Sequence, residues 1–375
     1  ALGLVAPSPV LAQAGALTEG PVVHAAAGDL RGKDQGGVAV FRGVPYAKPP
    51  VGERRWRPAE PLPAWRGVRE ATRFGAACMQ PPSPFQDHAA MSEDCLFLNV
   101  WTPGLDAGRR PVMVYIHGGG YSGGSGSSAL YDGKRLARRG DVVVVTLNHR
   151  LNLFGYAYLA RLAHGFEDSG AAGQLDLVLA LEWIRDNIAA FGGDPDRVML
   201  FGQSGGGAKI ATLMATPRAK GLFHSAATMS GQQVTAQGPI NGTLRSVAWL
   251  KTLGLTPDRA HEVMDMPVER LLEATATQDP ILGFGGLSYA PTLDFRTLSR
   301  HPFYPDAAPQ GLSIPMIIGN THDETRGFFR GNTRIHSLAW DELAQALGPE
   351  LRVDIDTKDV VAHYRALFPQ FSPTD

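Results

Sequence analysis

Residues 198–207 read Val-Met-Leu-Phe-Gly-Gln-Ser-Gly-Gly-Gly, and residues 208–214 continue as Ala-Lys-Ile-Ala-Thr-Leu-Met. An apolar run, a Gly-x-Ser-x-Gly turn and a helix-like run thus follow one another in the order strand, sharp turn, helix. Such a turn holds Ser204 with its hydroxyl exposed above the sheet, and the glycines beside it leave room for the strained backbone. The start of the helix places backbone N–H groups and a partial positive charge beside the negative charge that would develop on a substrate oxygen. The pattern predicts a nucleophilic serine, and the alternative is a glycine-rich turn with an incidental serine.

A second glycine-rich stretch, residues 115–124, reads Tyr-Ile-His-Gly-Gly-Gly-Tyr-Ser-Gly-Gly. Its Gly118, Gly120 and Gly123 match the dinucleotide-binding pattern. However, no helix begins there, and Asp141 precedes the next strand, where a ribose-binding acid should follow it. A phosphate-binding loop would need Gly-Lys-Ser or Gly-Lys-Thr, which this stretch lacks. A His-Gly-Gly-Gly loop ahead of a Gly-x-Ser-x-Gly turn is typical of an oxyanion-binding loop, so the two motifs together indicate a serine hydrolase.

Long apolar runs alternate with helical patterns from Leu96 onward. The predicted strands are residues 96–101, 112–116, 142–147, 198–201, 226–229 and 314–318. Continuous apolar runs are typical of strands covered on both faces, so the sequence predicts a mainly parallel sheet between layers of helices. The clearest helix is residues 174–190, which is followed by glycines and a proline.

Two further segments are predicted from their composition. Residues 42–52 contain three prolines and two glycines, and we expect an ordered surface loop there. Residues 232–309 show weaker periodicity, and we interpret them as a helical excursion that forms a lid or faces the substrate.

Length and charge limit the possible functions. The chain has 375 residues, 44% of them hydrophobic, and a formal net charge of -1. This length suits one large α/β domain or two ordinary ones. A near-neutral balance argues against a nucleic-acid or anionic-membrane partner, and no run reaches the ~18 apolar residues of a membrane-spanning helix. The expected partner is a small molecule.

The N-terminal residues are similar to the end of a secretory signal peptide. They read Ala-Leu-Gly-Leu-Val-Ala at 1–6 and Val-Leu-Ala-Gln-Ala at 10–14, which resembles an apolar core and a cleavage site without the basic start. We therefore predict that residues 1–14 are the remainder of a signal peptide, that residues 15–375 form the catalytic domain, and that the protein is secreted or periplasmic. The alternative is a frayed alanine-rich terminus.

The two cysteines are Cys78 and Cys95. A disulfide is the default for such a pair in an exported chain. Closing a loop of this size stabilises a protein by about 3 kcal/mol in the chain-entropy treatment. Two buried free thiols are the alternative.

The order of these motifs resembles that of the type B carboxylesterases, α/β hydrolases that include cholinesterases and para-nitrobenzyl esterases. The resemblance runs from about Val40 to the last residue. It rests on Phe-Arg-Gly-Val-Pro-Tyr-Ala at 41–47, Ser-Glu-Asp-Cys-Leu-Phe-Leu-Asn-Val at 92–100, His-Gly-Gly-Gly-Tyr at 117–121, Asn-His-Arg at 148–150, Asn-Ile-Ala-Ala-Phe-Gly-Gly-Asp-Pro at 187–195 and Phe-Gly-Gln-Ser at 201–204. Six motifs in the same order make a specific match.

The resemblance carries over to particular residues. It implies a nucleophile, Ser204, and an oxyanion hole formed by the N–H groups of Gly119, Gly120 and Gly205. It also implies that a Cys78–Cys95 disulfide closes a loop over the substrate gorge, and it implies no metal or organic cofactor. The chain departs from the family pattern at Gln203, where Glu is commoner, and at Gly205, where Ala is commoner. Neither change removes a reacting atom.

The acid of a catalytic triad should follow a later strand, as residues 319–324 do. Where the family motif reads Asp-Glu-Gly, this chain has Asp323, Glu324 and Thr325. This match implies that Glu324 is the carboxylate that orients a histidine and stabilises it once protonated. Asp323 is the alternative, and for either residue the non-catalytic interpretation is a solvated loop carboxylate.

The histidine base is not evident in this chain. Only His336 and His363 follow Glu324. His336 immediately precedes Ser337, the predicted cap of one helix, and His363 lies in another, so we expect both to be structural. In related esterases the base lies beyond the equivalent of the last residue here, and residues 372–375 read as the start of a helix. We therefore expect the chain to be a fragment whose base lies further along. His117, beside the glycine loop, is expected to pack and hydrogen-bond instead of acting as the base.

The sequence thus predicts an α/β-hydrolase fold and a serine carboxylesterase that hydrolyses a small-molecule ester through an acyl-enzyme on Ser204. The rival interpretations are a non-catalytic, esterase-like binding module, or an inert fragment of an active enzyme. Ser204 and the intact glycine loop favour the enzyme.

Overall fold

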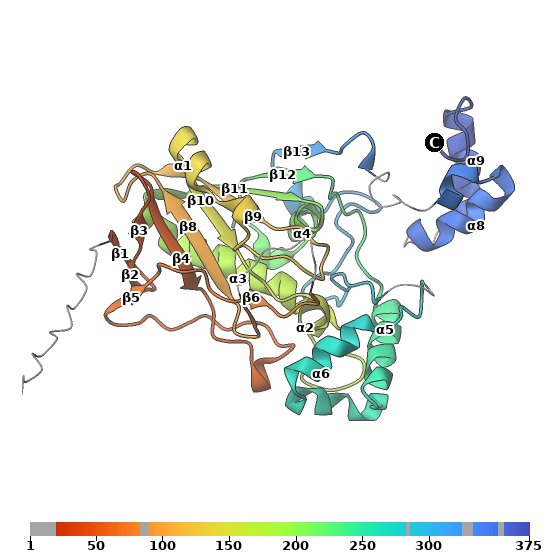
Figure 1. Ribbon diagram of the computed structural model, residues 1–375, viewed down its shortest axis with the longest axis horizontal. Coiled ribbons are helices and arrows are strands. Elements are labelled where there is room, and N and C mark those ends of the chain that lie inside the picture. Colours follow the sequence, from red (N-terminus) through yellow and green to blue (C-terminus); the bar gives the residue numbers. More distant parts are fainter. Residues whose placement is uncertain (1–19, 83–89, 283–285, 325–332, 352–355) are drawn as a thin grey trace, which may run out of the picture.

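The computed structural model describes residues 20–82, 90–282, 286–324, 333–351 and 356–375 (Figure 1). The predicted remainder of a signal peptide, residues 1–14, lies outside these ranges. Within them, no helix combines the length and the apolar character that crossing a membrane requires.

A central sheet organises the described part of the chain. Its strands follow the order β13-β12-β11-β9-β10-β8-β4-β3. Their bounds are β3 (Lys33–Asp34), β4 (Ala39–Pro45), β8 (Phe97–Thr102), β9 (Arg110–Ile116), β10 (Val143–Leu147), β11 (Gly193–Gln203), β12 (Ser225–Met229) and β13 (Met316–Gly319). The strands from β13 to β10 run parallel, and β8, β4 and β3 are antiparallel. The prediction of a mainly parallel sheet is therefore confirmed, as are the strands predicted from the apolar runs.

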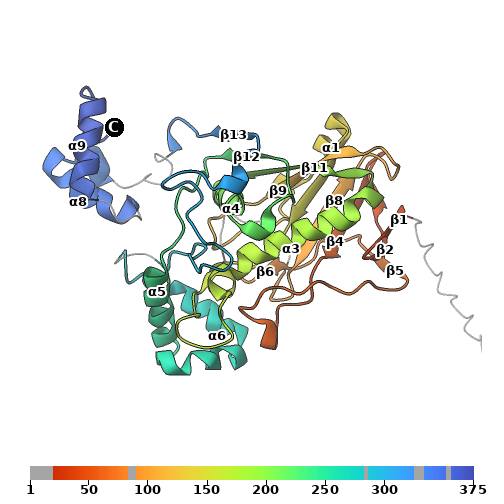
Figure 2. The same ribbon diagram turned by 180° about the vertical axis from the view of Figure 1, so that it is seen from behind.

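Helices cover both faces of this sheet. Helix α3 (Ala172–Asn187) crosses one face in Figure 2, and α1 (Lys134–Gly140) lies against β8 and β10. In β10, Val143 and Val145 belong to the core that contains the α3 side chains, whereas Val144 packs in a separate cluster with α1. Both faces of β10 are thus buried. This double burial is the physical reason for the continuous apolar run.

The expected helical excursion, residues 232–309, is helical only in its first half. Helices α5 (Pro239–Thr252) and α6 (Val268–Glu273) and short 3-10 turns fill that half. The described residues between 277 and 308 form no helix or strand beyond isolated bridges. The second half is held by loop contacts that leave no periodic pattern in the sequence.

A second hydrophobic core joins this excursion to the main body. The Trp56 ring stacks on Trp249 of α5 at 6.3 Å between centroids, and on Phe154 of α2 (Asn152–Tyr156) at 6.4 Å. These aromatic residues are buried. Helices α5 and α6 therefore pack beside α2 and below the sheet in Figure 1.

The remaining elements lie at the two ends of the chain. Strands β1 (Val22–Ala25), β2 (Gly28–Arg31) and β5 (Val68–Glu70) form a small sheet, and β6 (Ala77–Cys78) pairs with β7 (Met91–Ser92). Helices α8 (Trp340–Leu351) and α9 (Thr357–Leu367) pack on each other and lie apart from the sheet in both views (Figures 1 and 2).

The prediction of a surface loop at residues 42–52 is wrong for its first part. Strand β4 continues to Pro45, between β8 and β3 in the sheet. Its pairing with β8 shifts register between Phe41 and Val44, and Gly43 there has a φ of 71°. The Gly43 N–H donates to the Asn99 side-chain oxygen at 2.9 Å. Gly43 thus lies in a β-bulge, and Pro45 is the last residue of the strand.

Candidate active site

Ser204 lies at the turn between β11 and α4 (Gly205–Leu213), half-buried at the carboxyl end of the parallel strands. Its φ and ψ are 54° and -127°, a conformation that costs a side-chain-bearing residue of order 1–3 kcal/mol. Its N–H donates to the Met229 carbonyl at 2.8 Å, and its carbonyl accepts from the Ala208 N–H at 3.1 Å. Within the described part of the chain, the Ser204 hydroxyl makes no hydrogen bond. The hydroxyl is therefore held in place by the backbone and left free to react.

Glycines allow this turn to sit close to its neighbours. A Cβ on Gly206 would lie 2.0 Å from the Ile116 carbonyl oxygen of β9, and one on Gly231 would lie 2.0 Å from the Ser204 carbonyl oxygen. No side chain fits at either position without moving the backbone. The helix start can therefore approach the ends of β9 and β12 only because these residues are glycines.

The His-Gly-Gly-Gly loop follows β9, the strand next to β11, so parallel pairing brings the loop beside Ser204. Gly119 and Gly120 have φ values of 86° and 58°, which favour glycine. A Cβ on Gly205 would lie 2.2 Å from the Gly120 carbonyl oxygen. The structure thus brings together Ser204 and all three residues predicted to form the oxyanion hole.

Hydrogen bonds orient the peptide groups of this loop. The Gly118 carbonyl accepts from the His117 Nδ1–H at 2.9 Å, and the Gly119 carbonyl accepts from the Ser122 N–H at 3.2 Å and the Gly123 N–H at 3.1 Å. In a trans peptide, the carbonyl and the following N–H point in opposite directions. The N–H groups of Gly119 and Gly120 therefore point away from these donors, and neither has a hydrogen-bond acceptor among the described residues.

Glu324 is connected to this site through the ends of the neighbouring strands. Its carboxylate accepts a hydrogen bond from the Thr321 hydroxyl, and the Thr321 N–H donates to the Ser230 Oγ at 3.3 Å. Hydrogen bonds from Ser230 and Thr321 lower the pKa of Glu324. Ser230 directly follows Met229, whose carbonyl accepts from Ser204. The alternative acid, Asp323, is exposed and paired with His322 at 3.3 Å.

The two histidines that follow Glu324 are, unlike Glu324, not connected to the Ser204 site by hydrogen bonds among the described residues. His336 lies in a 3-10 turn and His363 in α9, and neither contacts Ser204 or Glu324. His117 is buried beneath the glycine loop and stacks on His149 at 4.9 Å between ring centroids. Burial lowers the pKa of His117 to about 3, with a further contribution from Lys209. As expected, His117 packs and hydrogen-bonds, and it stays neutral at ordinary pH.

Sequence reasoning missed two residues of this site, Ser230 and Lys209. Ser230 directly follows the apolar run of β12, as Ser204 follows that of β11. Because parallel strands end at the same edge of a sheet, this position was a signal that Ser230 lies near Ser204. Lys209 lies in an otherwise small and apolar run after the nucleophile, and its side chain is fully buried. A charged residue at a position that the helical pattern assigns to the core was the available signal.

The predicted disulfide is present, since Cys78 and Cys95 are bonded with their Cα atoms 4.9 Å apart. The segment after Cys78 reaches the glycine loop, because Gln80 accepts from the Gly124 N–H at 2.7 Å and donates to the Gly124 carbonyl at 3.0 Å. Among the described residues, no cluster of His, Cys, Asp or Glu is arranged to hold a metal ion.

Comparison with known proteins adds to this geometry. The sequence profile described as "Carboxylesterase family" matches residues 19–349. The chain is 40% identical over 319 residues to para-nitrobenzyl esterase of Bacillus subtilis (strain 168), covering 83% of this chain and 64% of that protein. It is 42% identical over 342 residues to fumonisin B1 esterase of Sphingopyxis macrogoltabida, covering 85% of this chain and 59% of that protein. The chain thus spans less than two thirds of the length of these relatives.

Solved structures agree with the sequence comparison. The crystal structure of carboxylesterase EST55 from Geobacillus stearothermophilus is 40% identical, with a TM-score of 0.81 over 92% of this chain and 70% of that one. A structure of a PNB esterase is 37% identical, with a TM-score of 0.82 over 95% of this chain and 73% of that one.

Proposed function

This chain belongs to the carboxylesterase family, and on that basis we propose that it hydrolyses carboxylic esters through an acyl-enzyme on Ser204. The single observation that carries the proposal is the environment of Ser204. Its hydroxyl has no internal hydrogen bond, and it stands beside loop N–H groups that also lack an acceptor within the described residues. Such groups are suited to binding negative charge that develops on a substrate.

The proposed reaction has two steps. The Ser204 Oγ attacks the ester carbonyl carbon while a base takes its proton, and the carbonyl oxygen becomes an oxyanion facing the N–H groups of Gly119, Gly120 and Gly205. Expulsion of the alcohol, with return of the proton, leaves an acyl-enzyme. Water then attacks the acyl carbon in the same way and releases the acid and free Ser204. We assign Glu324 to orienting a histidine base, and none of the described histidines contacts Ser204.

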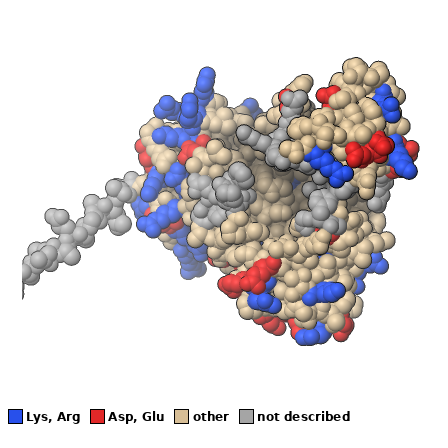
Figure 3. Space-filling model, turned by 45° about the vertical axis from the view of Figure 1, so that its right-hand side comes forward, with Lys and Arg blue, Asp and Glu red and all other residues tan. Residues whose placement is uncertain are grey.

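The proposed substrate is a small, uncharged ester. Figure 3 shows a recess in one face of the molecule whose visible walls are mainly uncharged, whereas Lys, Arg, Asp and Glu lie mostly on the outer parts of this face. The relatives differ in what their names say they act on, namely para-nitrobenzyl esters, phenmedipham and fumonisin B1. The family therefore supports the ester bond as the target and leaves the acid and alcohol parts open. Secretion or a periplasmic location, which the disulfide supports, is part of the same proposal.

Covalent labelling tests the proposal directly. A fluorophosphonate should add to full-length protein once per chain, because only a serine with a base and an oxyanion hole attacks phosphorus quickly. Ser204→Ala should abolish labelling, and Ser128→Ala, which removes a half-buried serine that caps a 3-10 turn, should retain it. Intact mass and peptide mapping measure both. Equal labelling of wild type and Ser204→Ala would overturn the assignment.

The rival function is a binding module without turnover. The observation in its favour is that no described histidine contacts the Ser204 hydroxyl. A protein that binds an ester, releases no alcohol from it and takes up no fluorophosphonate would support this rival against the hydrolase.

A further inference from the structure

A buried lysine lies directly beneath the proposed oxyanion hole. Lys209 belongs to α4, one turn beyond Gly205, and its side chain is 0% exposed. Its Nζ donates to the Gly120 carbonyl at 2.8 Å and to the His117 carbonyl at 3.0 Å. The ammonium also lies 5.5 Å from the centroid of the Tyr121 ring. Among the described residues, every hydrogen bond of this ammonium is thus with the glycine loop.

The charge of Lys209 has no carboxylate partner among the described residues. The titratable groups that face it are His117 and His149, whose pKa values burial lowers, and Tyr121, whose pKa burial raises. The buried carboxylate of Asp176 is paired with Arg150 at 2.6 Å. An unpaired ammonium in the interior is costly, and burial lowers the pKa of Lys209 to about 7. A neutral, apolar side chain would fill this space at lower cost.

The two hydrogen bonds from Lys209 complete the fixation of the loop. The Gly118 and Gly119 carbonyls are held by His117 and by the backbone, as described above, and Lys209 holds those of His117 and Gly120. All four carbonyls from His117 to Gly120 therefore accept hydrogen bonds. Three successive glycines would otherwise leave these peptide groups free to rotate. His117 and the backbone thus direct the Gly119 and Gly120 N–H groups, and Lys209 fixes the peptide planes on either side of them.

We propose that Lys209 is a positioning residue for ester hydrolysis, whose ammonium holds the glycine loop in its oxyanion-binding form and adds positive charge behind it. This proposal rests on the proposed function of Ser204. A fixed dipole array and a nearby positive charge favour the anionic tetrahedral state over the neutral ester. Lys209 should therefore act on kcat more than on KM.

Substitution of Lys209 tests this role in the full-length protein. Lys209→Met should lower kcat for p-nitrophenyl acetate by about 10- to 100-fold, less than the loss of a direct oxyanion donor, with little change in KM. Lys209→Arg, which keeps the charge, should recover part of the loss. Ile210→Val, a buried change on the same helix that faces the core, is the matched control and should leave kcat unchanged. Should Lys209→Met not fold, Lys209→Gln, which keeps N–H donors without charge, replaces it.

The pH dependence separates positioning by the ammonium from a merely structural role. The ratio of wild-type to Lys209→Met kcat should be largest at pH 6 and should fall towards pH 9, because the ammonium loses its proton with a pKa of about 7. A ratio that is constant with pH, or equal kcat values, overturns the proposal. Fluorophosphonate labelling of wild type is measured in parallel. Its absence would instead contradict the proposed function of Ser204.

Discussion

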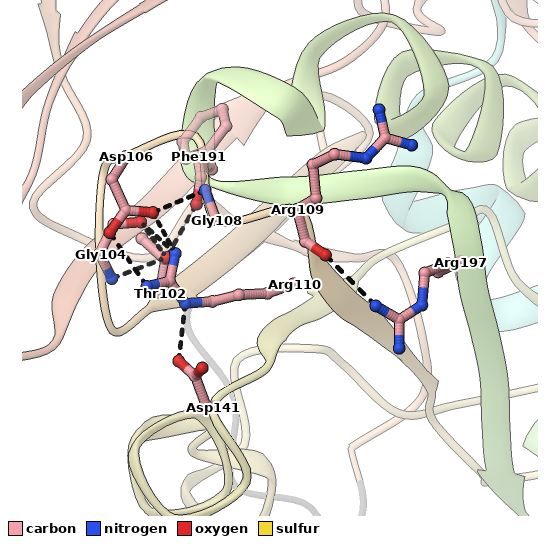
Figure 4. A network of polar contacts seen from close by, with 9 residues as sticks. All are labelled: Thr102, Gly104, Asp106, Gly108, Arg109, Arg110, Asp141, Phe191 and Arg197. Carbon is pink, nitrogen blue, oxygen red and sulfur yellow. Dashed lines mark hydrogen bonds and ion pairs between the residues drawn. The ribbon is translucent and has the colours of Figure 1, made fainter.

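Strands β9 and β11 each begin near paired charges, and the loops that follow them carry N–H and hydroxyl groups that make no hydrogen bond within the described residues. At their start, Arg110 contacts Asp106 at 2.5 Å and Asp141 at 2.7 Å (Figure 4). The neighbouring Arg109 contacts Asp194 of β11 at 2.8 Å. Arg109 and Arg110 thus each have at least one carboxylate partner, and Arg197 of β11 donates to the Arg109 carbonyl at 3.5 Å.

At the opposite end, the same two strands lead to glycines and to a strained serine. Gly119 and Gly120 follow β9, and Ser204 follows β11 with a positive φ. Buried Lys209 provides a positive charge there without a carboxylate partner among the described residues. At one end of this pair of strands the charged groups are paired, and at the other end the backbone is strained and a buried charge has no carboxylate partner among the described residues.

This difference separates what holds the fold from what is available to a substrate. Exposed ion pairs contribute about 0–1 kcal/mol each, so losing one leaves the fold intact. Strain and unpaired donors reduce stability, and they persist where the surrounding packing holds them in place. The double burial of the central strands provides that packing. Changes at the carboxyl end should therefore affect catalysis, and changes at the amino end should affect stability by small amounts.

The largest effect should come from the acid at the carboxyl end. In full-length protein, Glu324→Gln should lower kcat by about 10³- to 10⁴-fold with little change in KM, as neutralising a triad acid does. Asp323→Asn, at the preceding residue, is the matched control and should lower kcat only mildly. Burst and steady-state kinetics with an activated ester measure both variants. A larger loss in Asp323→Asn would reverse the two assignments.

An intermediate effect is expected where the disulfide supports the glycine loop. The double variant Cys78→Ser with Cys95→Ser should lower the free energy of unfolding by about 3 kcal/mol, because the unfolded chain gains the freedom of an open loop. Urea unfolding of exported protein, with and without reductant, gives this difference. Reductant should destabilise wild type and leave the double variant unchanged. Two free thiols in exported wild type would refute the bridge.

The smallest effect should come from the amino end. Arg110→Ala should lower the free energy of unfolding by about 1 kcal/mol or less and leave kcat unchanged. Hydrogen bonds from Arg110 lower the pKa of Asp106 from 3.8, so this contribution is present above pH 3.8 and is lost as the pH falls further. Urea unfolding at pH 7 and pH 3 tests the sign. A large loss of kcat would show that the two ends are coupled.

The sequence alone determined the parallel sheet, the main helix and the family, which are confirmed by the structure and by the comparisons. These features depend on burial of whole strands and on motifs contiguous in the chain, so they leave local patterns. Ser204, Glu324 and the three glycines were assigned in the same way, and their catalytic roles stay predictions. The structure adds that Ser204, the glycines and the strand end before Glu324 meet at one edge of the sheet.

Only the tertiary structure decided what lies around these motifs. The bulge at Gly43 keeps Pro45 in a strand because Asn99, far along the chain, accepts the hydrogen bond that the ladder loses. Ser230 and Lys209 make their side-chain hydrogen bonds with residues that follow other strands, Thr321 after β13 and the glycine loop after β9. A periodic pattern records which residues are buried. It does not record which distant backbone group a buried lysine will meet, because that depends on how β9 and α4 approach each other through their glycines.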